Sequence, residues 1–488
     1  MMPAMPEAES FLAAAAAIVG AQQLLTGCEA MAPYLADWRG HYRGAAIAVA
    51  RPAATAEVAA LVALCAKHGV PVVPQGGNTG LAGAATPDAS GRALVLCLGR
   101  MRRILEISAV AGTAAVEAGC VLADLHAAAE AAGLVFPLSL GSEGSCQIGG
   151  TIATNAGGTA VLRHGPMREL VLGLEVVLAD GTVCDWMSPL RKNAAGYDLK
   201  QLFIGAEGTL GVITAAVVKL FPRPAETATA MAAVADGRAA LALLERARRR
   251  LGDRLASFEV INRAQVAVVR REMPALRLPI GAAHPWQVLV ELTDTLSGTG
   301  LRGALESMLA AALEDGVVLD AAIAESAVQA EAMWRLRHSV SEANRRAGIN
   351  VSHDTAVPVD RQADFIAGIE ARLAARWPDT ELLMVGHLGD GNIHVILLLD
   401  PRHYADPLRQ RAMAGEINAI VDAVTLSLGG TVSAEHGIGQ SHLGRLLAAR
   451  GTADIALMRR LKAALDPHGL LNPGKIFALH PADGVAGP

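Results

Sequence analysis

Several common sequence features are missing from this chain, and each absence argues against a class of protein. None of the six cysteines lies in a C-x-x-C pair, so neither a zinc ribbon nor a cysteine-ligated iron–sulfur cluster is supported. No apolar run reaches the roughly 18–20 residues that a membrane-spanning helix needs. No basic block stands out, and the net charge of -5 gives no reason to expect nucleic acid. We therefore expect a cytoplasmic protein with neither nucleic-acid nor membrane partners.

Length and composition indicate a folded chain with more than one domain. With 488 residues the chain exceeds what one hydrophobic core organises, and 52% hydrophobic residues argue against disorder. Helical and strand patterns alternate at short spacing before the composition changes at "PRPAETATAM" (222–231), and longer helices follow it. We predict an α+β protein with an N-terminal helical segment (1–44), a ligand-binding domain (45–224), a second α+β domain with an antiparallel sheet (225–425) and a C-terminal helical segment (426–488).

Three glycine-rich segments fall in the first large domain. "QGGNTGLAG" follows the short strand pattern "VPVVP", and successive backbone N–H groups in such a loop suit a pyrophosphate, although a simple turn fits equally well. "PLSLGSEGSCQIGGTIATNAGG" (137–158) has few bulky side chains, so we expect a loop that lies against a flat, polar ligand. "GAEGTLGVIT" (205–214) repeats the theme before a strand. None is the G-x-G-x-x-G fingerprint, which argues against a nicotinamide partner.

In the second domain, "GHLGDGNIH" (386–394) lies between the apolar runs "ELLMV" and "VILLL". Apolar run, Asp-Gly turn, apolar run is typical of a β-hairpin. In a hairpin we expect His387 and His394 to stand across from one another, with Cβ atoms roughly 5 Å apart, which suits two imidazoles on one ion. A turn that carries incidental polar residues is the alternative.

A carboxylate for the same ion follows in "GGTVSAEHGIGQ", which carries Glu435 and His436. Two imidazoles and one carboxylate, His387, His394 and Glu435, make an open N, N, O site for a divalent metal; we expect zinc, and manganese, cobalt or iron would accept the same ligands. A turn at "HGIG" would bring His436 into the same pocket, where an imidazole serves as general base.

Together these motifs resemble the vanillyl-alcohol-oxidase-type flavoproteins, and more narrowly the branch with D-lactate dehydrogenase, the glycolate oxidase flavoprotein subunit and D-2-hydroxyglutarate dehydrogenase. The resemblance runs from "YLADWRGHYRG" to "LDPHGLLNPGKIF". It implies a two-subdomain FAD-binding domain and an α+β substrate (cap) domain. Some relatives link the flavin through a histidine where this chain has Asn78, so we expect non-covalent FAD. The resemblance implies that FAD is bound by Pro74, Gly76, Gly77, Asn78, Thr79 and Gly80 at the pyrophosphate, by Ser139, Gly141, Ser142, Gly149, Gly150, Thr154, Asn155 and Gly158 along the flavin and ribityl chain, by Glu207, Gly208 and Ile213 at the adenosine, and by Asn472.

The resemblance also implies a reaction, the oxidation of a D-2-hydroxy acid to the 2-keto acid with hydride transfer to flavin N5. Electrons would pass to a separate acceptor, such as an electron-transfer flavoprotein, a cytochrome or a quinone, and the chain could form a homodimer. Arginine binds carboxylates in a bidentate manner. Within "EAMWRLRHSVSEANRRAG" (331–348), which we predict as one helix, the family match falls on Arg337, with Ser341 one turn further on. The expected substrate-binding residues are Arg337, Ser341, His353 and Asn392.

Two positions depart from the relative that oxidises D-2-hydroxyglutarate, which has a lysine at Ser352 and an asparagine at Ile396. Both changes remove polar contacts from the region expected to hold the distal part of the substrate. D-2-hydroxyglutarate is the expected substrate, and D-lactate or glycolate is the alternative. A flavin-binding electron-transfer subunit without its own activity is a second alternative, and a metal-independent, ether-forming synthase of the same superfamily is a third.

Overall fold

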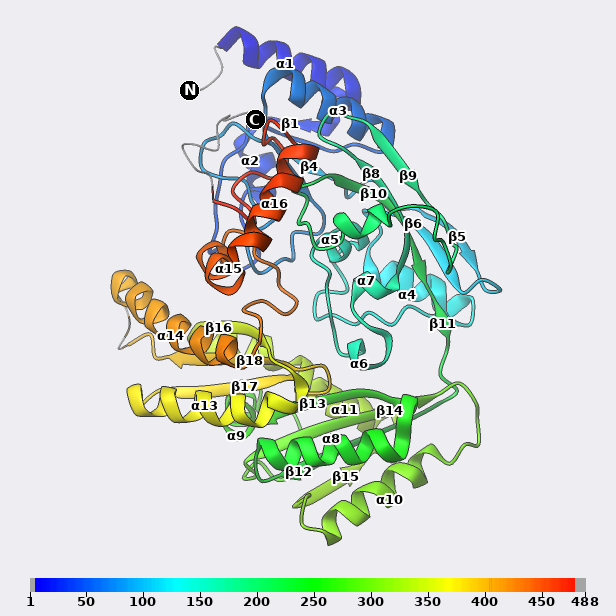
Figure 1. Cartoon of the computed structure of the whole chain (residues 1–488), viewed down its shortest axis with the longest axis vertical. Coiled ribbons are helices and arrows are strands. Elements are labelled where there is room, and N and C mark those ends of the chain that lie inside the picture. Colours follow the sequence, from blue (N-terminus) through cyan, green and yellow to red (C-terminus); the bar gives the residue numbers. More distant parts are fainter. Residues whose placement is uncertain (1–4, 403, 405, 479–488) are drawn as a thin grey trace. The chain divides into compact units, whose positions relative to one another are not determined.

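The computed structural model describes residues 5–402, 404 and 406–478. The chain divides into two compact units, one made of Met1–Gly157, Gly165–Arg223 and Glu435–Pro488, the other of Gly158–His164 and Pro224–Ala434. Figure 1 follows the chain from the first unit into the second and back. The predicted boundary at 224/225 lies one residue from the point where the chain enters the second unit, whereas the predicted boundary at 425/426 falls inside helix α14 (Pro407–Ser427).

The first unit contains two main sheets and a two-stranded one. In the smaller of the main sheets three parallel strands are buried along almost their whole length, as expected for a sheet covered on both faces. This sheet has the order β1 (Leu24–Leu25), β2 (Ala48–Ala50), β4 (Leu94–Cys97) and β3 (Val72–Gln75). The larger sheet is antiparallel, with the order β5 (Ile104–Ser108), β6 (Thr113–Glu117), β10 (Val212–Lys219), β8 (Val171–Val177) and β9 (Val183–Trp186), and β7 (Leu134–Val135) pairs with β11 (Phe221–Pro222).

Helices cover these sheets. The helix α3 buries Val58, Leu61, Val62 and Cys65 at spacings of three and four residues, and Gly69 ends it in the left-handed conformation. One predicted loop is wrong in part, because the middle of 137–158 forms the short helix α5. The α-helices of the unit are α1 (Met5–Val19), α2 (Cys28–Met31), α3 (Thr55–His68), α4 (Leu122–Ala131), α5 (Ile148–Ala153), α7 (Met167–Leu170), α15 (Leu443–Ala449) and α16 (Thr452–Leu465).

The second unit is built on one seven-stranded antiparallel sheet, which confirms the sheet type predicted from sequence. Its strand order is β15 (Asp320–Ile323), β12 (Glu226–Val234), β14 (Trp286–Asp294), β13 (Leu255–Asn262), β17 (Glu381–His387), β18 (Asn392–Leu399) and β16 (Ile349–Ala356). Alternate side chains along β18 enter two different hydrophobic clusters, with Ile393, Val395 and Leu397 in one and Ile396 and Leu398 in the other. The sheet is therefore buried on both faces.

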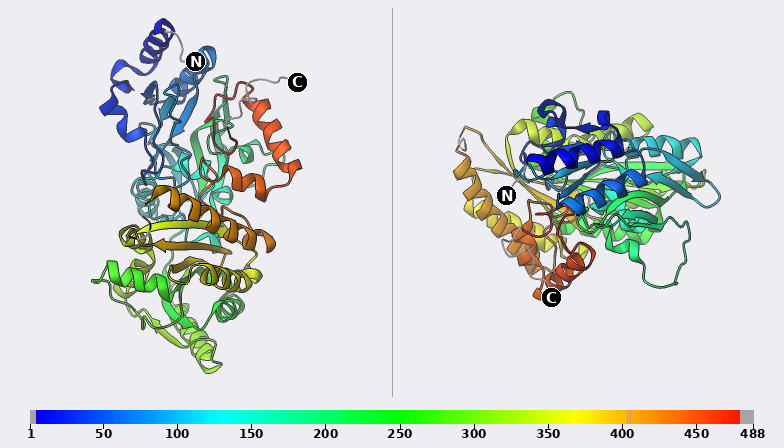
Figure 2. Two further views of the ribbon diagram at one scale, coloured as in Figure 1. Left: turned by 90° about the vertical axis from the view of Figure 1, so that its left-hand side faces the viewer. Right: turned by 90° about the horizontal axis from the view of Figure 1, so that it is seen from above.

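Different helices cover the two faces, and we name each face after one of them. The α14 face also carries α8 (Gly237–Leu251), α10 (Leu301–Glu314) and α13 (Gln362–Arg376), and Figure 2 shows α14 lying across the edge of the sheet that includes β16. The α11 face carries α9 (Arg263–Glu272), α11 (Ala327–His338) and α12 (Val340–Ala347). The short helix α6 (Val161–His164) also belongs to this unit. Among the described helices none is both long enough and apolar enough to cross a membrane.

Candidate functional site

A groove in the first unit brings together segments that are far apart in sequence. It encloses about 590 Å³ of space, part of it open to solvent. Its walls come from the end of β3, from α5, and from the turn before β10, so small residues line most of it. The lining residues are Pro74, Gln75, Gly76, Ala84, Ala85, Leu98, Ala118, Gly149, Gly150, Ala153, Thr154, Glu207, Gly208, Gly211, Val212, Ile213 and Asn472.

Half of the residues expected to bind FAD line this groove. They come from all three glycine-rich segments and from the C-terminal segment: Pro74, Gly76, Gly149, Gly150, Thr154, Glu207, Gly208, Ile213 and Asn472. The other half lie outside the lining: Gly77, Asn78, Thr79, Gly80, Ser139, Gly141, Ser142, Asn155 and Gly158. The Asn78 side chain donates to the Ala36 carbonyl at 2.7 Å, so its amide holds a neighbouring loop.

The residues present fit a bound cofactor at two points of the groove. The side-chain oxygen of Asn472 is buried and accepts no hydrogen bond within the described chain, while its amide nitrogen donates to the Glu207 and Ala84 carbonyls. An added Cβ on Gly149 would approach the Ala118 Cβ to 2.6 Å, so the wall needs a glycine there. A flat ligand with hydrogen-bond donors, such as FAD, matches this cradle of backbone and small residues.

Glu207 lines the groove and also makes contacts that the sequence did not predict. Its buried carboxylate accepts hydrogen bonds from the backbone N–H groups of Ile438 and Gly439, both at 2.7 Å, and so holds the turn that follows His436. Burial raises the pKa of the Glu207 carboxyl, and the two N–H donors oppose that rise. The family resemblance implied that Glu207 contacts adenosine. It did not indicate that Glu207 also holds the "HGIG" turn.

The predicted hairpin in the second unit is confirmed, and its register corrects one detail. Strands β17 and β18 are antiparallel and joined by the turn Leu388–Gly391. His387 pairs directly with Asn392, whereas His394 pairs with Val385, so the two histidines are diagonal neighbours rather than opposite one another. Their rings still meet edge to face with centroids 5.9 Å apart.

Each of these histidines has a buried carboxylate beside its Nδ1 atom. The His387 Nδ1 atom lies 2.6 Å from Glu259 Oε1, and the His394 Nδ1 atom lies 3.6 Å from Asp354 Oδ1. Both carboxylate side chains are only 1% exposed. Proteins commonly orient imidazoles that bind metals through Nε2 by a carboxylate beside Nδ1.

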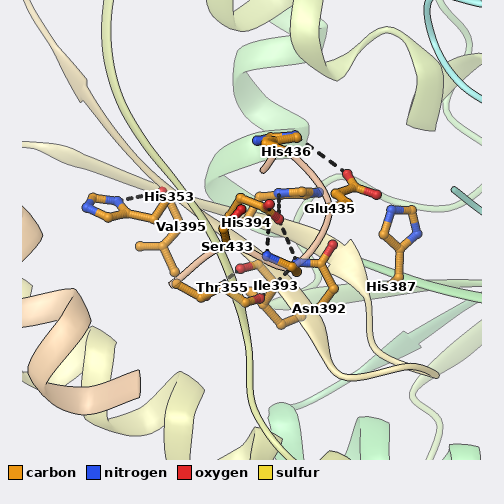
Figure 3. Close-up of polar contacts among 12 residues, drawn as sticks. His353, Thr355, His387, Asn392, Ile393, His394, Val395, Ser433, Glu435 and His436 are labelled. Atoms are coloured by element: carbon orange, nitrogen blue, oxygen red, sulfur yellow. Dashed lines mark hydrogen bonds and ion pairs between the residues drawn. The ribbon is translucent and has the colours of Figure 1, made fainter. Parts of the chain in front are cut away.

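Glu435 and His436, the other two residues predicted around the metal, directly follow Ala434, the last residue of the second unit. The Ala434 N–H donates to Asp354 Oδ2 at 3.0 Å. One ligand atom from each of Asp354, His394, Glu435 and His436 lies within 4.8 Å of the others, which makes these residues a candidate metal group. Figure 3 shows His394, Glu435 and His436 converging, with Glu435 Oε1 3.6 Å from His436 Nε2. His387 is not in this group.

The residues expected to bind the substrate lie on both faces of the sheet of the second unit. Arg337 lies on the α11 face with its side chain 12% exposed, and it donates from Nε to Glu259 Oε2 at 2.7 Å. Asn392 donates to Asp354 Oδ1 at 3.0 Å, while its own buried oxygen accepts no hydrogen bond within the described chain. His353 is on the α14 face, where its Nε2 lies 2.8 Å from Asn418 Oδ1; Figure 3 shows its ring pointing away from the metal group.

The single helix predicted over 331–348 is wrong, because the chain forms two helices that meet at Ser339. Arg337 is in the last turn of α11, and Ser341 is in the first turn of α12, where its side chain is exposed. The break therefore removes Ser341 from the helical face that it would otherwise share with Arg337.

The two positions that depart from the hydroxyglutarate pattern are partners in the sheet. Ser352 of β16 pairs directly with Ile396 of β18, two residues from the Asp354–His394 pair along both strands. Side chains two residues apart share a face, so Ser352 and Ile396 are on the α11 face with the metal group. Ile396 is buried and Ser352 is exposed.

Sequence reasoning missed Glu259 and Asp354. Glu259 did leave a signal, because it is the one charged residue in the mostly apolar strand "LASFEVIN". Asp354 left a weaker signal, since it adjoins His353 in a strand whose two faces the sequence does not distinguish. Burial raises the pKa of the Glu259 carboxyl, but the charges and hydrogen bonds of His387 and Arg337 prevail and hold that pKa below its ordinary value.

Two protein families match separate segments that together make up most of the chain. Residues 46–186 match the family described as "FAD binding domain", and residues 223–476 match "FAD linked oxidases, C-terminal domain". The second match alone spans more than half of the chain.

Similar proteins share one name. A protein from Oryza sativa subsp. indica, named probable D-2-hydroxyglutarate dehydrogenase, mitochondrial, is 37% identical over 90% of this chain and 77% of its own length. The Bos taurus D-2-hydroxyglutarate dehydrogenase, mitochondrial, is 37% identical over 94% of this chain and 82% of its own. The D-2-hydroxyglutarate dehydrogenase of Xanthomonas citri pv. viticola is 37% identical over 92% and 93%.

Solved structures agree on the fold. Substrate-bound p-cresol methylhydroxylase aligns over 98% of both chains with a TM-score of 0.78 and 17% identity. The 4-ethylphenol oxidase of Gulosibacter chungangensis aligns over 98% of this chain and 99% of its own, with a TM-score of 0.72 and 21% identity. These likenesses confirm the predicted vanillyl-alcohol-oxidase-type fold. The family matches and the relatives at 37% identity show that this chain is an FAD-binding member of the FAD-linked oxidase family, in the group of the D-2-hydroxyglutarate dehydrogenases.

Proposed function

We propose that this chain oxidises D-2-hydroxyglutarate to 2-oxoglutarate with non-covalent FAD and one divalent metal ion. The observation that carries the metal part is the pair of hairpin histidines, each with its Nδ1 atom beside a buried carboxylate. The names of the relatives support the substrate. When bound, FAD supplies a hydride acceptor at N5, and the ion supplies a positive charge that favours loss of the substrate's hydroxyl proton.

His387, His394 and Glu435 are the proposed ligands of the ion. Asp354 is near enough to compete, but its carboxylate already accepts hydrogen bonds from Asn392 and Ala434 and lies beside His394 Nδ1. These contacts suit a group that orients His394. The two imidazole nitrogens and one carboxylate that remain are a donor set that zinc, manganese, cobalt and iron all accept.

The other side chains divide the remaining work. Arg337 binds the C1 carboxylate of the substrate, since a guanidinium pairs with two carboxylate oxygens at once. The unpartnered Asn392 oxygen accepts a hydrogen bond from the bound substrate or a water molecule. His436 removes the hydroxyl proton, and its side chain is 27% exposed, so solvent can take up that proton afterwards. The substrate thus loses a proton and a hydride and becomes the keto acid.

Completion of the cycle needs an electron acceptor, because the reduced flavin must be reoxidised. An electron-transfer flavoprotein, a cytochrome or a quinone is proposed, with the cytoplasm as the compartment and a homodimer as the assembly. Several relatives have the word mitochondrial in their names, and that compartment applies to those proteins.

A second substrate class is favoured by one specific observation. Ser352 and Ile396 form a cross-strand pair beside the metal group and offer no cation to a second carboxylate. A shorter acid such as D-lactate or glycolate needs no such partner. We retain it as the alternative.

Anaerobic bleaching of the flavin absorbance tests both proposals. D-2-hydroxyglutarate, D-lactate and glycolate are mixed separately with the FAD-loaded protein, with and without prior EDTA treatment. We expect fastest bleaching by D-2-hydroxyglutarate, slowed strongly by EDTA and restored by zinc or manganese. Faster bleaching by D-lactate would select the alternative. No bleaching by any of the acids would select the flavin-binding subunit without its own dehydrogenase activity.

A further inference from the structure

A carboxylate lies in the middle of the sheet of the second unit, where a charge is costly. Glu259 belongs to the central strand β13, and its side chain is 1% exposed. An isolated buried carboxylate costs several kcal/mol and persists only where charges and hydrogen bonds compensate it. The compensating groups should therefore reveal why the charge is there.

Both oxygens of Glu259 are engaged, each by a different residue of the proposed site. Oε1 lies 2.6 Å from His387 Nδ1, and Oε2 accepts a hydrogen bond from Arg337 Nε at 2.7 Å. Arg337 Nη2 in turn approaches His387 Nε2 at 3.5 Å. Three side chains from β13, β17 and α11 thus close a ring of polar contacts on the α11 face.

The chemistry of these neighbours fixes the position of the ring proton on His387. An ionised carboxylate only accepts hydrogen bonds, so the nitrogen that faces Glu259 must carry the proton. A guanidinium only donates, so the nitrogen that faces Arg337 must carry the lone pair. Both neighbours select the same tautomer, with the proton on Nδ1 and the lone pair on Nε2.

We propose that Glu259 is a positioning residue that sets the tautomer of His387 and the orientation of Arg337 at the same time. This inference rests on the proposed function, in which His387 binds the ion and Arg337 binds the substrate carboxylate. The Glu259 carboxylate then links metal binding by His387 to carboxylate binding by Arg337, because removal of Glu259 would disturb both side chains. An ion at Nε2 displaces only the longer Nη2 contact and leaves the Nε bond of Arg337 to Glu259 in place.

A second carboxylate on the same face provides an internal comparison. Glu291 of β14 accepts hydrogen bonds from Trp334 of α11 and Thr229 of β12, and it contacts neither histidine of the hairpin. It is partly buried and ties α11 to the sheet. Substitution of Glu291 therefore measures what any loss of a carboxylate under α11 does to the fold.

The isosteric variant Glu259→Gln tests the proposal. A glutamine amide accepts through its oxygen and donates through its nitrogen, so it cannot accept from both His387 and Arg337. If the NH2 group faces His387, the ring must accept at Nδ1 and carry its proton at Nε2, where the ion would bind. If it faces Arg337, two donors oppose each other and the guanidinium must move. Glu259→Asp keeps the charge on a shorter side chain.

Two measurements on the full-length, FAD-loaded protein follow. Competition with a fluorescent zinc chelator gives the zinc affinity, and long-range proton–nitrogen NMR on histidine-labelled, metal-free protein gives the tautomer of His387, assigned with His387→Gln. We expect the wild-type protein to carry the proton on Nδ1. Glu259→Gln should bind zinc about 10–100-fold more weakly. Glu259→Asp should be intermediate, and Glu291→Gln should match the wild type.

The proposal is overturned if wild-type His387 carries its proton on Nε2, or if Glu259→Gln binds zinc as tightly as Glu291→Gln does. A wild-type protein that binds no zinc also overturns it, because the proposed ligand set then fails. Neither measurement uses a hydroxy acid, so an error about the substrate leaves both results valid. Steady-state kinetics add a separate check on Arg337: Glu259→Gln should raise KM for the hydroxy acid more than Glu291→Gln.

Discussion

The candidate ligand sites of the two units are built from different kinds of residue. The groove of the first unit is lined mainly by small and apolar residues, with Glu207 as its one charged lining residue, whereas the second unit gathers Glu259, Asp354, Arg337 and two histidines on one face of its sheet. A site made of backbone and small residues depends on shape, so an added methyl group should damage it. A site made of charges depends on its partners, so the loss of one group should disable chemistry while the fold persists.

The largest expected effect comes from the second unit. His394→Ala removes a proposed metal ligand, and the loss of several kcal/mol of charge stabilisation corresponds to about a 10³-fold fall in kcat. The measurement is dye-linked turnover, with the FAD absorbance per chain recorded on the same sample. We expect the FAD content to stay at the wild-type value.

His284→Gln is the matched control for that variant. His284 lies in the same unit and pairs with Asp320 at 3.2 Å, away from the hairpin histidines. Its turnover should stay within a few-fold of the wild type. Full turnover by His394→Ala would remove this histidine from the proposed site.

The converse effect is expected in the first unit. Gly149→Ala places a methyl carbon 2.6 Å from the Ala118 Cβ at the wall of the groove. Overpacking of this kind costs about 1–3 kcal/mol of folding free energy. Part of the strain should be relieved by movement of the groove wall, so we expect a roughly 10-fold weaker Kd for FAD. Flavin fluorescence titration of the apoprotein gives the Kd, while zinc binding should persist.

Gly144→Ala provides the control, because an added Cβ there meets no atom within 4 Å and its backbone has an ordinary φ. Its affinity for FAD should equal that of the wild type. Equal affinities for Gly149→Ala and Gly144→Ala would show that the groove does not depend on close packing at α5.

The smallest expected effect concerns a buried charged residue of the first unit, Lys475. Burial lowers the pKa of Lys475 from 10.5 to about 8, and the carboxylates of Asp88 and Glu207 only partly oppose this. The folded-state pKa lies below the unfolded one, so the cost of burial is fully present below pH 8 and disappears as pH rises through 10.5. This difference corresponds to at most about 3 kcal/mol.

Lys475→Met should therefore raise the melting temperature of the FAD-loaded protein by a few degrees at pH 7. The advantage should shrink as the pH approaches 10, because the wild-type lysine is then neutral in the folded protein. Thermal unfolding across this pH range provides the measurement. An advantage that is the same at pH 7 and pH 10 would contradict a charge-based cause.

Local patterns predicted the parts of the site that are local in the chain. The Asp-Gly turn between two apolar runs indicated the hairpin, and the pattern around Glu435 and His436 indicated a turn. Pairing between distant strands could not be read in this way. Glu259 is 128 residues from His387, and nothing local specifies that β13 and β17 are neighbours. The break at Ser339 was also hidden, because serine does not by itself end a helix.

The register of the hairpin limits how this protein can change during evolution. Surface loops usually tolerate insertions, but the turn Leu388–Gly391 sets which residues of β18 point to the α11 face. A deletion or insertion of one residue there would carry His394, Asn392 and Ile396 together to the α14 face. We therefore expect natural relatives that keep both hairpin histidines to keep the length of this turn, whatever happens to its sequence.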